Sequence, residues 1–120
     1  MTELDEILAG LTEQVDGALA AAVGGMDGLV VEKVGSAREE LDAFVAELTN
    51  VLTASSSALG HRLDGGPLQE LILSAERLTA YVRVLDRDLY CVLLLDVGGN
   101  LGKARLYSGY AGKRILEALA

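Results

Sequence analysis

The spacing of apolar residues along the chain alternates between a helical and an extended period. Residues 36–60 are the longest helical stretch, with apolar side chains recurring every three to four positions. Ser36, followed three residues later by Glu39, matches the capping box that satisfies free backbone donors at a helix start. One face of this predicted helix must lie on a sheet or another helix, and it comprises Leu41, Phe44, Val45, Leu48, Val51, Leu52, Ser55 and Leu59.

The opposite side of the same predicted helix carries small side chains rather than long charged ones. These are Ala43, Ala46, Asn50, Ala54 and Ser57. Small side chains let a second helix approach closely and lose little rotamer entropy on burial. The stripe therefore indicates a protein–protein contact, although helix propensity also permits an Ala- and Ser-rich face open to solvent.

A first helix and a hairpin precede the long helix. Thr2 is a candidate cap for a helix that runs to about Gln14. Strands are predicted over residues 18–23 and 29–34, joined by a glycine-rich turn over 24–28. A phosphate-cradling loop is the functional alternative for these glycines, but no Gly-Lys-Ser/Thr ending and no following helix accompany them.

Three further strands and a final helix follow the long helix. The strands span residues 68–75, 78–85 and 89–97, and their short connections force antiparallel neighbours. Pro67 places the first of them at a sheet edge, and the continuous apolar run of residues 90–95 predicts a central strand covered on both faces. Asn100 should cap the last helix, whose buried stripe is Leu101, Ala104, Ser108, Ala111, Ile115 and Leu119.

Two features of the last helix concern its surroundings. Gly102, Gly109 and Gly112 weaken the helix intrinsically, so they predict close packing on the sheet. Leu106 and Tyr110 point away from the buried stripe, where they are either partner contacts or single exposed apolar residues of the ordinary kind.

Composition and charge narrow the class of protein. The chain has 120 residues, which predicts one domain over 1–120. The net charge of −8 is concentrated at the start, since residues 1–50 hold eleven acids and two bases. This balance argues against nucleic-acid binding and favours a basic protein partner. No signal peptide or membrane span is apparent, and the single cysteine fits a reducing, cytoplasmic environment.

Catalytic chemistry is poorly represented in the chain. His61 has no nearby cysteine or second histidine to form a metal site, and Cys91 lies in an apolar run that predicts a buried structural thiol. Nearby carboxylates such as Glu39 and Glu40 have a structural reason to occur in the first turn of a helix. We therefore expect a binding protein rather than an enzyme, with no cofactor and no metal.

The order of elements and three short motifs resemble the Roadblock/dynein light chain family, and within it the bacterial MglB-type regulators. The motifs are Val15-Asp16-Gly17, Gly25-Met26-Asp27-Gly28-Leu29, and residues 95–105 with Asn100-Leu101-Gly102-Lys103-Ala104-Arg105. The resemblance covers about residues 4–119. It implies an α/β (α+β), profilin-like three-layer sandwich, in which a five-stranded antiparallel sheet carries the long helix on one face and the terminal helices on the other.

The resemblance also implies a function and an assembly. MglB-type proteins are homodimers that regulate a small Ras-like GTPase in processes such as cell polarity or motility, without a catalytic side chain of their own. In this chain the dimer interface would comprise the small-residue stripe together with Leu68, Glu70 and Ile72 of the edge strand. Candidate contacts to the GTPase are Glu39, Glu40, Asp42 and Glu47. The alternative is a dimerising scaffold that does not affect nucleotide turnover.

Overall fold

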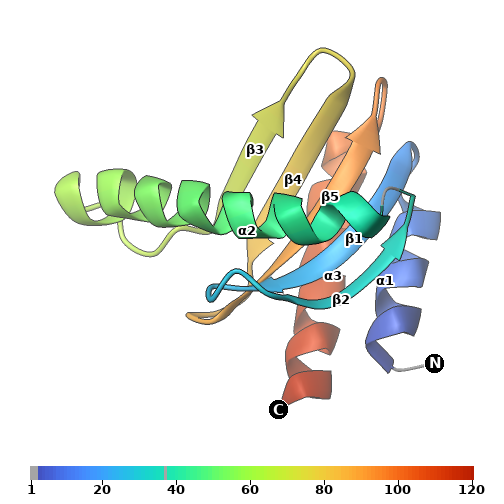
Figure 1. The fold of residues 1–120 in the computed structure, drawn as a ribbon, viewed down its shortest axis with the longest axis horizontal. Coiled ribbons are helices and arrows are strands. Elements are labelled where there is room, and N and C mark those ends of the chain that lie inside the picture. The colour runs from blue at the N-terminus through green and yellow to red at the C-terminus, as the bar shows by residue number, and fades with distance from the viewer. Residues whose placement is uncertain (1–2, 37) are drawn as a thin grey trace.

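The chain folds around a five-stranded antiparallel sheet with the strand order β2-β1-β5-β4-β3 (Figure 1). The computed structural model describes residues 3–36 and 38–120, so the predicted cap at Thr2 lies outside the described residues. The elements are α1 (Glu3–Gln14), β1 (Ala18–Gly25), β2 (Val30–Gly35), α2 (Arg38–Ser55), the π-helix η1 (Ser56–Arg62), β3 (Glu70–Ser74), β4 (Leu78–Val84), β5 (Leu89–Asp96) and α3 (Leu101–Leu119).

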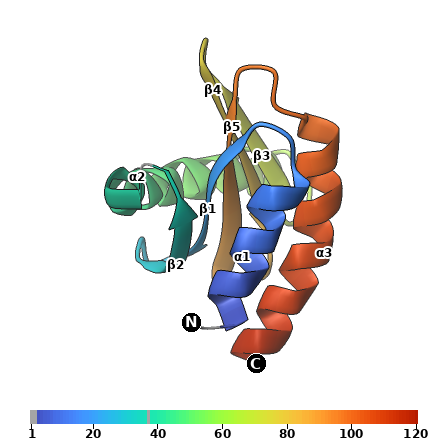
Figure 2. The ribbon, with the colours of Figure 1, turned by 90° about the vertical axis from the view of Figure 1, so that its right-hand side faces the viewer.

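The sheet separates two layers of helices, as Figure 2 shows. Helix α2 covers one face, where Leu41, Val45, Leu48 and Leu52 pack against alternate residues of the strands. Helices α1 and α3 lie side by side on the other face, around a second core that includes Tyr81 and Leu93. Strand β5 is central and almost completely buried. The predicted three-layer sandwich, with a central last strand and an edge strand at β3, is confirmed.

A buried hydroxyl pair fastens α2 to the sheet. The Tyr90 hydroxyl on β5 donates a hydrogen bond to the Val45 carbonyl at 3.0 Å and lies 2.9 Å from Thr49 Oγ1. Burial raises the pKa of Tyr90, because the ionised phenolate would be poorly solvated there. Polar groups in this position keep their hydrogen bonds inside the protein, which fixes where the helix crosses the sheet.

The long helix differs from its prediction at both ends. It begins at Arg38, and the Ser36 hydroxyl donates to the Leu19 carbonyl on β1. After Ser55 the hydrogen-bond pattern widens to that of a π-helix, a rare feature often found at functional sites. The predicted burial of Val51 and Leu59 is wrong, because both are exposed. The last part of the helix projects past the sheet edge at β3, so no sheet lies beneath it (Figure 1).

The strand boundaries also differ by a few residues from the prediction. Strand β1 continues through the two glycines to Gly25, with an irregular register between Val23 and Gly24, while β3 is shorter than predicted. Gly17, which introduces β1, has a φ of +83° and lies against the backbone of Gly99, where an added Cβ would stand 2.6 Å from the Gly99 Cα. Both conditions require glycine.

Helix α3 starts as predicted, with the Lys103 amide donating to the Asn100 side chain at 2.9 Å. Four of the predicted buried residues are buried, but Leu119 is exposed because it lies at the end of the helix. Close packing is confirmed at Gly112, where a Cβ would lie 2.7 Å from Leu85 Cδ2. It is wrong at Gly102, which is exposed in the first turn.

Candidate interaction surface

The outer edge of the sheet at β3 is open, and an apolar groove adjoins it. The backbone of β3 pairs with β4 on one side only, and Ile72 and Leu73 in its middle are each 37% exposed. A groove of about 440 Å³ lies between this strand and the first turns of α2. Its lining residues are Glu40, Leu41, Phe44, Leu73, Ser74, Ala75, Leu78, Ala80 and Leu94. An unpaired strand next to an apolar groove is a typical site for adding a further strand or helix.

The π-helix and the loop that follows it extend beyond this same edge (Figure 1). Leu59 is 53% exposed and Leu63 is 73% exposed in this projecting arm, which comprises residues 56–66. The arm is internally compact, since the Gly65 amide donates to the Leu59 carbonyl at 2.9 Å. A chain lying alongside β3 would therefore meet exposed leucines as well as the strand and the groove.

The predicted contact residues of α2 are all on the surface. Ala43, Ala46, Asn50, Ala54 and Ser57 are exposed, as are the acidic residues Glu39, Glu40, Asp42 and Glu47. Two of these acids contact other parts of the chain. Asp42 forms an ion pair with Lys33 of β2 at 2.7 Å, and Glu40 borders the groove. The acids thus surround the first half of α2, and the small residues follow its length.

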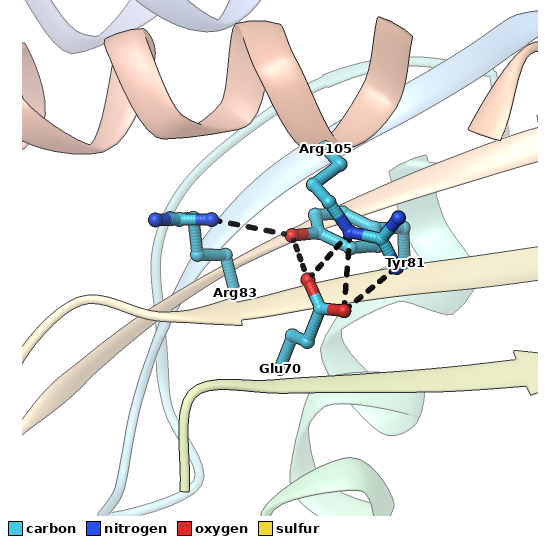
Figure 3. Close-up of polar contacts among 4 residues, drawn as sticks. All are labelled: Glu70, Tyr81, Arg83 and Arg105. Atoms are coloured by element: carbon cyan, nitrogen blue, oxygen red, sulfur yellow. Dashed lines mark hydrogen bonds and ion pairs between the residues drawn. The ribbon is translucent and has the colours of Figure 1, made fainter. Parts of the chain in front are cut away.

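Glu70 was predicted at the dimer interface from its place in the edge strand, but its carboxylate turns towards α3. Figure 3 shows this carboxylate between Arg105 and Tyr81. Arg105 Nη2 donates to Oε1 at 2.7 Å, Arg105 Nε lies 3.1 Å from both oxygens, and the Tyr81 hydroxyl donates to Oε2 at 2.7 Å. The backbone of Glu70 stays at the edge while its charge ties the edge strand to α3.

This cluster shifts the ionisation of its members. The hydrogen bonds from Arg105 hold the pKa of the Glu70 carboxyl below its usual value. Burial raises the pKa of Tyr81, and its hydrogen bond to Glu70 acts in the same direction. Leu68 and Ile72, the other predicted edge residues, are half-buried and exposed respectively. Leu68 packs against the α2-side core, whereas Ile72 lies opposite Tyr81 on the α3 side.

The groups with potential for chemistry are dispersed. Cys91 is buried in β5, and burial raises the pKa of its thiol to about 12. His61 is exposed near the end of η1. Within residues 3–36 and 38–120, no three His, Cys, Asp or Glu side chains come together to hold a metal ion. The helices of this same part of the chain include none that is long and apolar enough to cross a membrane.

Sequence reasoning did not find the groove, the projecting arm or the partner of Glu70. The observed register sets Glu70 opposite Arg83 on one face of the sheet, and a charge pair across two neighbouring strands is a signal that sequence inspection could have found. No periodic pattern connects Glu70 with Arg105, because the two lie on different elements. The groove depends on how far α2 leaves the sheet uncovered, which helix length alone does not determine.

Comparisons with known proteins agree with this architecture. The Roadblock/LC7 domain family matches residues 4–94, most of the chain. None of the curated proteins matches the chain.

Solved structures share the fold at low sequence identity. A Roadblock/LC7 domain from Streptomyces avermitilis is 19% identical, with a TM-score of 0.90 and 98% of both chains covered. The gliding protein MglB of Thermus thermophilus is 23% identical, with a TM-score of 0.85, covering 96% of this chain and 87% of that one. Myxococcus xanthus MglB is 13% identical, with a TM-score of 0.88, covering 99% and 96%.

Proposed function

Since this chain belongs to the Roadblock/LC7 domain family, we propose that it is a cytoplasmic, homodimeric regulator of a small Ras-like GTPase. The observation that carries the proposal is the open β3 edge beside the apolar groove, on the same side of the sheet as the acids of α2. The likeness to MglB structures supports the same class of protein.

The proposed dimer places two β3 strands edge to edge about a twofold axis, so that the two sheets become one. The axis turns the projecting arm of each copy over the sheet of the other, on the side of the groove. Leu59 and Leu63 then lose their solvent exposure, and so do Leu73 and Leu78. Burial of this apolar surface, at about 25 cal/mol per Å², together with new backbone hydrogen bonds, stabilises the pair.

The small-residue stripe would line the proposed seam and the outer surface of the paired α2 helices. Ala54 lies close to the projecting arm, and its short side chain allows a second helix to approach. The edge strand contributes to the proposed interface through the backbone of Leu68, Glu70 and Ile72. Ile72 also contributes its exposed side chain. The interface would then combine the small-residue stripe with the edge strand.

The GTPase would bind across the paired α2 helices. The exposed carboxylates of Glu39, Glu40, Asp42 and Glu47 present negative charge there, which speeds encounter with a basic surface. Binding energy that favours one arrangement of the GTPase switch segments alters nucleotide turnover without a catalytic group from the regulator. We propose that the protein acts in this way, by binding rather than by catalysis.

A GTP hydrolysis time course with a candidate Ras-like GTPase tests the regulatory role. A changed rate at saturating regulator supports it. Binding without any change in turnover, measured for both hydrolysis and nucleotide exchange, would instead identify a dimerising scaffold.

A calorimetric titration locates the contact surface. Reversing the charges of Glu39, Glu40 and Glu47 together should weaken GTPase binding at least tenfold. The matched control reverses Glu3, Glu6 and Glu13, three exposed acids of α1 on the other face of the sheet, and should leave the affinity unchanged. Equal affinities for both triple variants would refute the proposed contact surface.

A further inference from the structure

The outer surface of the α1/α3 layer carries two strips of opposite charge. The acidic strip on α1 consists of Glu3, Glu6 and Glu13, all exposed. The basic strip on α3 consists of Lys103, Lys113 and Arg114. Between these bases lie two large exposed apolar side chains, Leu106 at 50% and Tyr110 at 58%. Exposed apolar residues flanked by charge are typical of an interface.

The two helices run antiparallel, which sets the relative heights of their residues. Lys103 Nζ lies 3.1 Å from Asp16 Oδ2, and the Asn100 amide donates to the Asp16 carbonyl, so α3 begins beside the end of α1. Figure 2 shows the start of α1 and the end of α3 at the same end of this layer. Counting away from the Asp16–Lys103 pair at equal rise, Tyr110 comes level with Ala9 and Lys113 with Glu6.

A gap on α1 lies level with the protruding aromatic ring of α3. Gly10 is four residues after Glu6 and three before Glu13, so it shares their side of the helix. A Cβ at Gly10 would meet no heavy atom within 4 Å. The acidic strip is therefore interrupted by an open position, at about the height where the basic strip carries Tyr110.

We propose that this layer is a second self-association surface, on which the α1/α3 layers of two copies pack face to face. The twofold axis runs parallel to the helices, midway between α1 and α3. Rotation about such an axis keeps every residue at its height, so Tyr110 of each copy meets the Gly10 region of the other and Lys113 meets Glu6. The four helices then alternate in direction, as in an antiparallel bundle.

A second copy fits this surface better than an unrelated acidic protein, because only self-pairing uses both strips. The strips also match in length, at about 15 Å from Glu3 to Glu13 and about 17 Å from Lys103 to Arg114 at the rise of an α-helix. The net charge of −8 opposes an anionic membrane as the occupant. Because the surface lies on the opposite side of the sheet from α2, it does not depend on the proposed GTPase regulation.

A disulfide trapping experiment tests the contact directly. Gly10→Cys and Tyr110→Cys are made in separate preparations, and Cys91 does not interfere because it is buried. Under mild oxidation the mixture should give a cross-linked pair containing one of each variant. Either variant alone should give none, since the geometry separates like positions. Absence of the mixed pair would overturn the proposal, because a disulfide needs Cα atoms within about 7 Å.

Charge exchange provides an independent measurement in sedimentation velocity. Lys113→Glu or Glu6→Lys alone should weaken the self-association at least tenfold, and the two together should restore it. The series is repeated with Ala54→Glu, which removes the proposed α2/β3 dimer. If Ala54→Glu still self-associates, and if either charge variant weakens this association while the two together restore it, the second surface is supported. If all charge variants sediment like their parent, the proposal fails while the α2/β3 dimer is unaffected.

Discussion

Arg105 and Glu70 lie 35 positions apart in the chain, yet their side chains form a two-pronged ion pair. Arg105 belongs to α3 and Glu70 to the edge strand β3, so the pair joins one helical layer to the open edge of the sheet (Figure 3). Tyr81 adds a hydrogen bond from β4. The position of the edge strand is thus stabilised by charge from the face opposite α2.

This pair should make stability depend on pH in the acidic range. The pKa of Glu70 is lower in the folded chain than in the unfolded one, so its contribution is present above the unfolded pKa. It is lost as pH falls through the folded pKa. Glu70→Gln should therefore unfold more easily than wild type at neutral pH, with the difference shrinking as the solution is acidified. Denaturant unfolding across this pH range measures it, and a difference independent of pH would contradict the assignment.

The proposed α2/β3 seam should be sensitive to charge at Ala54. Ala54→Glu buries an unpaired carboxylate if the seam forms, which costs about 3–5 kcal/mol and weakens the dimer by more than a hundredfold. Thr53→Glu is the control, because Thr53 is also exposed but lies outside the proposed seam. Its hydroxyl donates to the Thr49 carbonyl, and the Thr49 side chain in turn bonds to Gly25 and Tyr90 of the sheet. Both variants are sedimented in a Lys113→Glu background, which weakens the proposed α1/α3 contact, and Ala54→Glu should then be a monomer while Thr53→Glu remains a dimer. An intact dimer in both would exclude this seam.

Two glycines should respond to alanine in opposite ways. Gly17→Ala places a side chain at positive φ, at a cost of about 1–3 kcal/mol from the backbone, and brings it against Gly99. Gly10→Ala adds a methyl group to open space on an α-helix and should stabilise the fold by about 0.5–1 kcal/mol. Thermal or denaturant unfolding checks both. Comparable stabilities for the two variants would contradict the close approach at Gly17.

The buried tyrosine hydroxyl on β5 should contribute measurably to stability. Tyr90→Phe removes the hydrogen bond to the Val45 carbonyl and the contact with Thr49, and should cost about 1–2 kcal/mol. Tyr110→Phe removes a hydroxyl from an exposed tyrosine and should change stability by less than about 0.5 kcal/mol. Urea unfolding of both variants makes the comparison, and a loss at Tyr110 as large as at Tyr90 would refute the role given to the buried pair.

Much of the architecture followed from local patterns in the sequence. Pro67 indicated that the strand after it lies at a sheet edge, and the continuous apolar run of residues 90–95 identified the central strand. The order of elements indicated the family, which the match over residues 4–94 confirms. Such patterns are informative because side-chain direction repeats with backbone geometry.

The residues wrongly predicted to be buried lie at the limits of the core. Leu59 continues the apolar period of α2 but is exposed, since the helix runs past the last strand, whereas Val51 is exposed at the margin of the face that buries Leu48 and Leu52. Leu119 is exposed for the same kind of reason, at the end of α3. Periodicity predicts which side of a helix faces a core, but it does not report where that core ends.

The sequence by itself therefore determined the elements, the family, the edge position of β3 and the exposed small-residue stripe of α2. Only the tertiary structure decided the groove beside that edge, the direction of the Glu70 carboxylate, and the open space beside Gly10. Backbone geometry repeats over a few residues and can be recognised locally. Contacts between distant segments depend on how whole elements pack, and no local pattern contains that information.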